Sequence, residues 1–98
     1  MAAELIVSQV KIRLSRGSTS DLLGWASCVI NDALFLNSIE IWGCPDGKLW
    51  LKFPASSSRT GTEYQYFCPV NHQARAVLDE AILAGFRNES RRYEERKQ

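Results

Sequence analysis

The sequence predicts an α+β fold, in which a small antiparallel β-sheet of meander type carries one C-terminal α-helix packed on or beside it. Short segments of alternating apolar and polar residues, joined by turns, indicate half-buried antiparallel strands. Apolar residues recur at three- and four-residue steps only in the last third of the chain, which indicates a single helix. A chain of 98 residues can bury one small core. We therefore expect a single domain over 1–88, followed by a polar tail over 89–98.

The first half of the chain is expected to supply three extended segments. Around positions 10–14, apolar residues alternate with Lys11 and Arg13, which is typical of a half-buried strand. A polar turn over 15–20 leads to a second strand over 22–30. After a break at 31–32, the chain is expected to run extended to position 42, with a kink at Asn37.

The middle of the chain predicts a turn, a strand and a loop. Gly47 can adopt the positive φ that a tight turn at 45–47 requires. The following strand, over 48–53, places Lys48, Trp50 and Lys52 on one face and apolar residues on the other, and it ends at Pro54. The Ser-rich segment 55–61 lacks an apolar anchor and is expected to be a mobile loop, before a last strand over 62–67.

The helix is expected to begin at Asn71, a residue type that caps helix N-termini well. Its apolar stripe needs a surface, and the only large one available is the sheet face that bears Val10, Ile12, Leu49 and Leu51. Gly85 lies within the stripe and either weakens the helix or allows close packing. The segment 89–98 is almost purely polar, so it is either a solvated extension of the helix or disordered.

Composition and charge limit the function. With 45% hydrophobic and 23% charged residues, the chain is typical of an ordinary globular protein. A net charge of +1 excludes a strongly basic nucleic-acid clamp and leaves room for a local basic patch. The apolar runs are too short to span a membrane, and the start lacks the pattern of a signal peptide, so we expect a cytoplasmic protein without membrane contact.

The residues that carry chemistry in other proteins are scattered here. The three cysteines lack the spacing of a zinc site or a disulfide framework and are expected to be reduced. His72 is the only histidine, and no acid and nucleophile accompany it. We therefore expect neither an enzyme nor a bound metal or cofactor.

The order of these parts resembles the stage V sporulation protein G (SpoVG) family of small bacterial regulators. The similarity runs from about Val10 to Phe86 and depends on order and spacing rather than on one specific motif. The matching segments are residues 10–13, residues 26–35, the strand from Gly47 to Pro54, the spacing from Pro54 to Pro69 with Gly61 between, the helix start at 69–71, and Arg75.

The resemblance implies a small curved antiparallel sheet with a C-terminal helix, assembled as a homodimer through strand pairing. It also implies sequence-selective binding of DNA and RNA, with effects on septation, sporulation and gene expression. Family members typically carry a basic pair just after the proline that ends the 47–54 segment. Here Ser56 and Ser57 occupy those positions, and only Arg59 follows nearby.

Five residues are predicted to bind nucleic acid: Arg75, Arg59, Lys52, Lys48 and Trp50. Lysines beside an aromatic side chain on one strand face can hold phosphate and stack a base; alternatively, Trp50 packs against a dimer partner. A cation in the first helical turn opposes the helix dipole, so Arg75 is expected to meet a phosphate or an acidic side chain in the dimer, or to be a plain surface arginine. Trp25 and Trp42 are expected in the core or an interface.

Two functions remain open from the sequence. The first is a dimeric nucleic-acid-binding regulator that uses the helix start and the adjacent strand and loop. The second is a protein–protein adaptor of the same fold in cell-division control, which binds a division protein and no nucleic acid. A homodimer is expected in either case, because one helix can cover only one face of so small a sheet.

Overall fold

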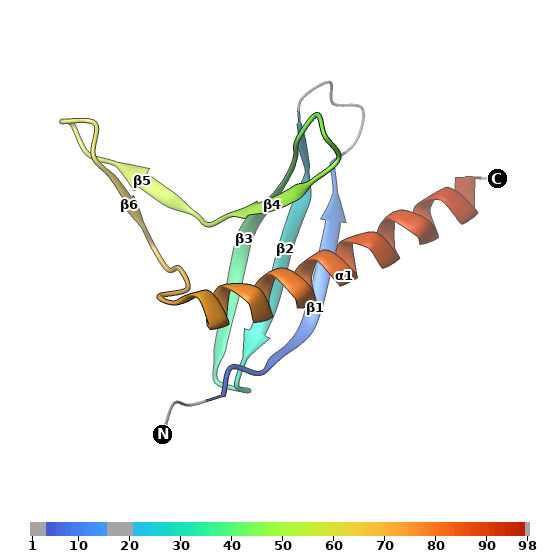
Figure 1. Cartoon of the computed structure of the whole chain (residues 1–98), viewed down its shortest axis with the longest axis horizontal. Coiled ribbons are helices and arrows are strands. Elements are labelled where there is room, and N and C mark those ends of the chain that lie inside the picture. The colour runs from blue at the N-terminus through green and yellow to red at the C-terminus, as the bar shows by residue number, and fades with distance from the viewer. Residues whose placement is uncertain (1–3, 16–20, 98) are drawn as a thin grey trace.

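A four-stranded antiparallel sheet, a two-stranded arm and one long helix make up the computed structural model, which describes residues 4–15 and 21–97 (Figure 1). The predicted α+β meander is confirmed, and the predicted turn at 16–20 lies outside the described residues. The elements are β1 (Val7–Leu14), β2 (Leu22–Ile30), β3 (Leu34–Gly43), β4 (Leu49–Lys52), β5 (Ala55–Ser57), β6 (Glu63–Gln65) and α1 (His72–Lys97). The four-stranded sheet has the order β1-β2-β3-β4, so each of its strands pairs with its neighbour in the chain.

Among the described residues, three register shifts interrupt the pairing of the sheet, one of them between Leu22 and Gly24 on β2. The pairing of β1 with β2 shifts between Ser8 and Lys11, where Gln9 has a φ of 50°. The pairing of β2 with β3 shifts between Ala26 and Cys28, opposite Ser38, whose φ is 63°. Bulges of this kind bend a strand and increase its twist. The kink expected at Asn37 is therefore confirmed within one residue.

The core lies between α1 and one face of the sheet (Figure 1). Leu78 and Ile82 of the helix are buried against strand residues, and each such side chain stabilises the fold by about 1.5–3 kcal/mol. The helix lies close to β1 at Gly85, since a Cβ there would stand 2.9 Å from Cγ1 of Val10. The other buried apolar residues are Ala26, Cys28, Ile30, Ile39, Ile41, Leu51 and Phe53.

Asn71 caps the helix as expected: its Oδ1 accepts a hydrogen bond from the backbone N–H of Ala74 at 2.8 Å. The helix then continues without a break to Lys97, so the segment 89–97 takes the helical alternative. Glu89 accepts a hydrogen bond from Nη2 of Arg96 at 3.1 Å, one of the polar contacts along this exposed end.

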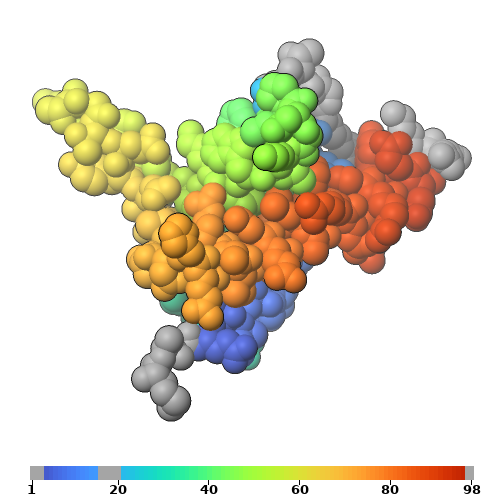
Figure 2. Space-filling view, in the orientation of Figure 1, coloured from blue at the N-terminus to red at the C-terminus, as the bar shows by residue number. Residues whose placement is uncertain are grey.

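Strands β5 and β6 form an arm that stands away from the body of the protein (Figures 1 and 2). The prediction of a loop over 55–61 is wrong for its first three residues, which pair with β6 from Ala55–Gln65 to Ser57–Glu63. The observed β6 is also shorter than the strand predicted over 62–67. The arm is held together by backbone hydrogen bonds between two short strands and not by a pattern of apolar side chains. The pairing of 55–57 with 63–65 was therefore not predictable from the pattern of residues.

Candidate functional site

The face of the sheet opposite α1 carries a row of polar and aromatic residues that crosses all four strands. Arg13 on β1 pairs with Trp25 on β2, Trp25 pairs with Glu40 on β3, and Glu40 pairs with Lys52 on β4. Side chains alternate between the faces of a strand. Since the neighbours Ile12, Ala26, Ile39, Ile41 and Leu51 contact the core beneath α1, the row lies on the uncovered face.

Two aromatic contacts order this face. The guanidinium carbon of Arg13 lies 4.8 Å from the ring centre of Trp25, a cation–π distance. Trp42 and Trp50 stack with ring centres 5.9 Å apart and planes 19° apart. The indole N–H of Trp42 donates a 2.9 Å hydrogen bond to Oε1 of Glu40, which links the stack to the row. Trp50 is 41% exposed, so part of its ring surface is available to a ligand.

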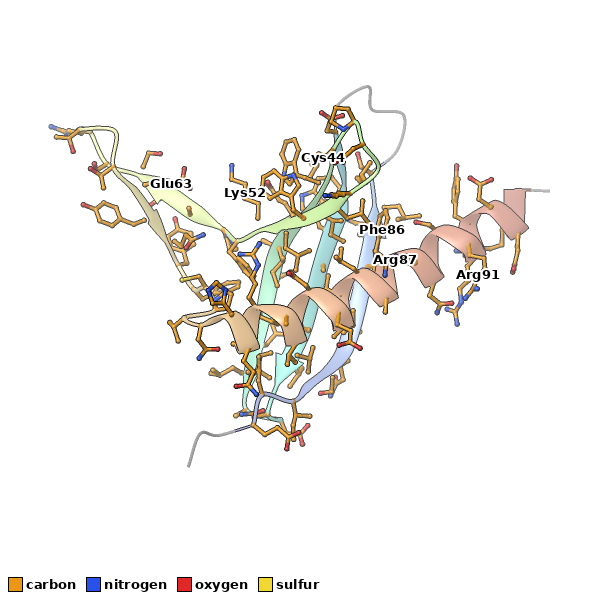
Figure 3. All side chains as sticks on the ribbon, viewed as in Figure 1. Cys44, Lys52, Glu63, Phe86, Arg87 and Arg91 are labelled. Carbon is orange, nitrogen blue, oxygen red and sulfur yellow. The ribbon has the colours of Figure 1, made fainter. Side chains whose placement is uncertain are left out.

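The row borders two hollows in the surface. One, of about 510 Å³, lies between the row and the arm; Arg13, Trp25, Glu40, Lys52, Ser57 and Glu63 are among the residues that line it. The other, of about 300 Å³, extends along β1 and β2 toward Lys11, Asn37 and Ser38. Figure 3 shows Lys52 on β4 and Glu63 on the arm. Both volumes fall within the range of about 300–1,000 Å³ that is usual for small-ligand clefts.

The structure distributes the five predicted site residues over separate places. Trp50 and Lys52 lie together on the uncovered face, and exposed Lys48 directly precedes β4. Arg59 is exposed in the turn at the tip of the arm. A 3.0 Å hydrogen bond from the Gly61 N–H to the Ser58 carbonyl closes this turn. Arg75 lies at the start of α1, on the covered side of the sheet.

Arg75 has partners within its own chain. Its Nη2 donates a 3.1 Å hydrogen bond to the carbonyl oxygen of Leu51, and its Nε lies 3.4 Å from Oδ1 of Asp79. Its guanidinium carbon lies 5.3 Å from the ring centre of Phe53. Asp79, one turn later in the same helix, is thus an acidic neighbour of Arg75, whereas the sequence led us to expect a phosphate or an acidic side chain in the dimer.

Sequence reasoning missed four residues of this face: Arg13, Trp25, Glu40 and Trp42. The alternation at 10–14 did indicate that Arg13 points away from the apolar face of its strand. Its position opposite Trp25 depends on strand register, and the bulge between Ser8 and Lys11 alters that register. Large aromatic residues are usual in cores and interfaces, so the sequence alone favours those places for Trp25 and Trp42, and the structure has both half-buried on this face.

Metal-binding and thiol groups are not gathered into a site in the described part of the chain. Residues 4–15 and 21–97 contain no cluster of three or more His, Cys, Asp or Glu side chains that could hold a metal ion. Within the same residues, no helix combines the length and apolar character needed to cross a membrane. Cys44 and Cys68 are exposed, whereas burial raises the pKa of the Cys28 thiol above its ordinary value of 9.0.

The fold and this face define a small α+β domain with an open sheet face of mixed basic and aromatic character. The chain is 33% identical over 82 residues to a protein of Phytoplasma australiense named "Putative septation protein SpoVG". The aligned region covers 84% of this chain and 83% of that protein. This chain belongs to the SpoVG family of septation proteins, as the resemblance in its sequence predicts. No family model matches the chain.

Proposed function

We propose that this protein is a homodimeric regulator that binds DNA or RNA and thereby affects septation, sporulation or gene expression in bacteria. Membership of the SpoVG family supports a role in septation. The observation that supports nucleic-acid binding most directly is the row of Arg13, Trp25, Glu40 and Lys52 beside the Trp42–Trp50 stack.

The uncovered face has the two kinds of group that nucleic acids require. Lys11, Arg13 and Lys52 supply cations for phosphate, and the indole of Trp50 supplies a surface on which a base can stack. Glu40 lies within the row and Glu63 lines the adjoining cleft, so the three cations leave this area with a net charge of only +1. A local patch of this size is compatible with a net charge of only +1 for the whole chain.

Fluorescence anisotropy of short labelled DNA and RNA, titrated across salt, tests this proposal. We expect sub-micromolar binding that weakens steeply with salt. The slope of log K against log salt counts the phosphate contacts, at about 0.9 per contact for duplex DNA and about 0.7 for single strands. Absence of binding to both polymers at low salt would refute the nucleic-acid proposal.

The arm supports the homodimer. An isolated two-stranded hairpin is only marginally stable in water, and β5 and β6 contact mainly each other. Tyr64 and Tyr66 on this arm are 59% and 70% exposed. A second copy of the chain that packs against the arm would cover both tyrosines and could pair with an open strand edge.

The alternative function is a protein–protein adaptor in cell-division control. Ser56 and Ser57 on β5 are exposed where the family resemblance leads us to expect a basic pair, which favours this alternative. A tagged protein that captures a division protein from lysate equally well before and after nuclease treatment would support it. Capture that nuclease abolishes would favour the regulator.

A further inference from the structure

The uncovered face itself offers ring surfaces and hollows, and the two-stranded arm beside it carries one cation, Arg59, against one carboxylate, Glu63. Strands β1 to β4 present their side chains across an open sheet, and α1 lies on the opposite side (Figure 1). Duplex DNA is read by helices or ribbons that enter a groove, and its base faces are stacked inside the helix. The bases of a single strand are free to stack on aromatic side chains.

We propose that this face binds nucleic acid as a single strand, with one base stacked on Trp50 and a neighbouring base in the cleft between the row and the arm. The proposal rests on the proposed function and adds the strand state, the position and a base preference. Trp42 stacks on Trp50 from one side, and Trp50 as a residue remains 41% exposed, so ring surface is left for the base.

The cations beside the cleft suit the phosphates that would flank these bases. Lys52 lies two residues from Trp50 on β4 and lines the cleft. Arg13 lines both hollows, and its guanidinium is held over Trp25 at 4.8 Å. A guanidinium fixed in this way can contact a phosphate or stack on a base.

The carboxylates in the cleft give a preference among bases. Glu40 and Glu63 line it from β3 and β6. A carboxylate accepts hydrogen bonds, and the exocyclic amino group of cytosine donates them. Thymine and uracil present a carbonyl oxygen at that position, which would face the carboxylate unfavourably. The cleft therefore favours a cytosine over a thymine or uracil of otherwise similar size.

Strand state is tested with one labelled sequence, prepared as single-stranded DNA, as single-stranded RNA and as duplex DNA. We expect both single strands to bind more tightly than the duplex, and the two single strands show whether the sugar matters. Trp50→Ala is expected to weaken single-strand binding by about 5- to 150-fold, the effect of losing one stacked base. Trp50→Phe should recover most of the affinity, because a phenyl ring also stacks.

Two variants control for general effects. Tyr93→Ala removes an aromatic residue that is 38% exposed near the far end of α1, and we expect it to leave affinity unchanged. Lys52→Ala and Arg87→Ala each remove one positive charge, the first from the uncovered face and the second from an exposed position on α1. We expect Lys52→Ala to weaken binding and Arg87→Ala to leave it unchanged. Far-ultraviolet circular dichroism of each variant shows whether the fold is retained.

Base preference is tested with short oligomers of deoxycytidine and deoxythymidine, compared at the same length and salt. We expect the wild-type protein to favour the cytosine oligomer. Glu40→Gln retains an oxygen that can accept the hydrogen bond from Trp42 while removing the charge, and it should reduce the ratio of the two affinities. A ratio that stays unchanged in both Glu40→Gln and Glu63→Gln would overturn the assigned base preference.

The outcomes separate this inference from the proposed function. The inference would be overturned if duplex DNA bound more tightly than the single strands and if Trp50→Ala and Lys52→Ala had the same affinities as Tyr93→Ala and Arg87→Ala. That result would leave the proposal of a nucleic-acid-binding regulator intact. Absence of binding to every polymer would refute the proposed function itself. If Trp50→Ala instead converts a dimer to a monomer, the face is an interface between copies of this chain, and the single-strand site is refuted.

Discussion

The guanidinium of Arg75 donates a hydrogen bond to the carbonyl oxygen of Leu51 at 3.1 Å and so ties the first turn of α1 to the edge strand β4. Asp79 and the ring of Phe53 hold the same guanidinium from two other sides. Because these partners fix the side chain, Arg75 contributes to the junction between helix and sheet, whatever its role toward a ligand.

Replacing Arg75 with methionine is expected to lower the free energy of unfolding by about 1–2 kcal/mol, the contribution of a charged hydrogen bond at a partly exposed site. Urea denaturation measures the change. Arg87→Met, at an exposed position of the same helix, is the matched control and should be close to neutral. Equal stability of both variants would contradict a structural role for Arg75.

Because Arg75 is held by contacts within its own chain, a change at Arg75 tests the helix–sheet junction together with nucleic-acid binding. If these two predicted residues contact nucleic acid, charge reversal of Arg75 and Arg59 together abolishes binding and leaves the dimer intact, but reversal at Arg75 also places a carboxylate beside Asp79 and removes the hydrogen bond to Leu51. Arg59→Glu alone is the cleaner test, since Arg59 is exposed at the tip of the arm and its change should not alter the helix–sheet junction. Retained affinity in the double variant would remove both residues from the site.

Gly85 allows α1 to approach β1, and this predicts an unusual response to alanine. In an open helix position Gly→Ala stabilises by about 1 kcal/mol. Here the new Cβ would stand 2.9 Å from Cγ1 of Val10, so we expect Gly85→Ala to destabilise the protein by roughly 1 kcal/mol.

A double-mutant cycle separates the two effects. In a Val10→Ala background the contact is relieved, and Gly85→Ala should then stabilise. Ala84→Gly, at the exposed neighbouring position, calibrates the helix propensity in this protein. Stabilisation by Gly85→Ala in the wild-type background would show that helix and strand are not in close contact there.

Cys28 predicts a loss of stability in alkaline solution. Burial raises the pKa of its thiol in the folded protein above 9.0, whereas the unfolded thiol ionises near that value. The buried thiol's contribution to the free energy of unfolding is fully present below pH 9.0. Between pH 9.0 and the raised pKa of the folded protein, the unfolded thiol releases its proton and the folded thiol does not, so this contribution is lost as the pH rises through the folded pKa.

Denaturation at a series of alkaline pH values measures this contribution, and Cys28→Ala should show a shallower decline than the wild type. Cys44→Ala, which changes an exposed thiol, should keep the wild-type slope. In the folded protein, a thiol reagent should modify Cys44 and Cys68 rapidly and Cys28 only on unfolding. Rapid modification of Cys28 in the native state would contradict its burial.

The arm predicts the oligomeric state. We expect light scattering to give twice the 11.1 kDa chain mass for the full protein. A variant in which a short Gly-Ser linker replaces residues 56–65 should be monomeric and retain the circular dichroism of the sheet and helix. A wild-type monomer at micromolar concentration would refute the dimer, and a dimeric variant would refute the role of the arm.

The sequence predicted the elements that local patterns specify. Asn71 identified the helix start, and the alternation of Trp50 and Lys52 with Leu51 assigned the two faces of β4 correctly. It could not predict that Arg13 lies opposite Trp25, because the register of β1 against β2 decides which residues face each other, and a bulge between Ser8 and Lys11 shifts that register. The partner of Arg75 was equally hidden, since Leu51 lies 24 residues earlier in the chain.

The base of the arm is fixed although its length is exposed. Phe67 packs edge-on against the core residue Phe53, and the Tyr66 N–H donates a 2.9 Å hydrogen bond to the Pro54 carbonyl. Residues 56–57 and 59–66 beyond this anchor are exposed, so substitutions there have little effect on the core. The outer part of the arm can therefore change its side chains, and with them the surface that it presents, while the core and the fold of the domain stay the same.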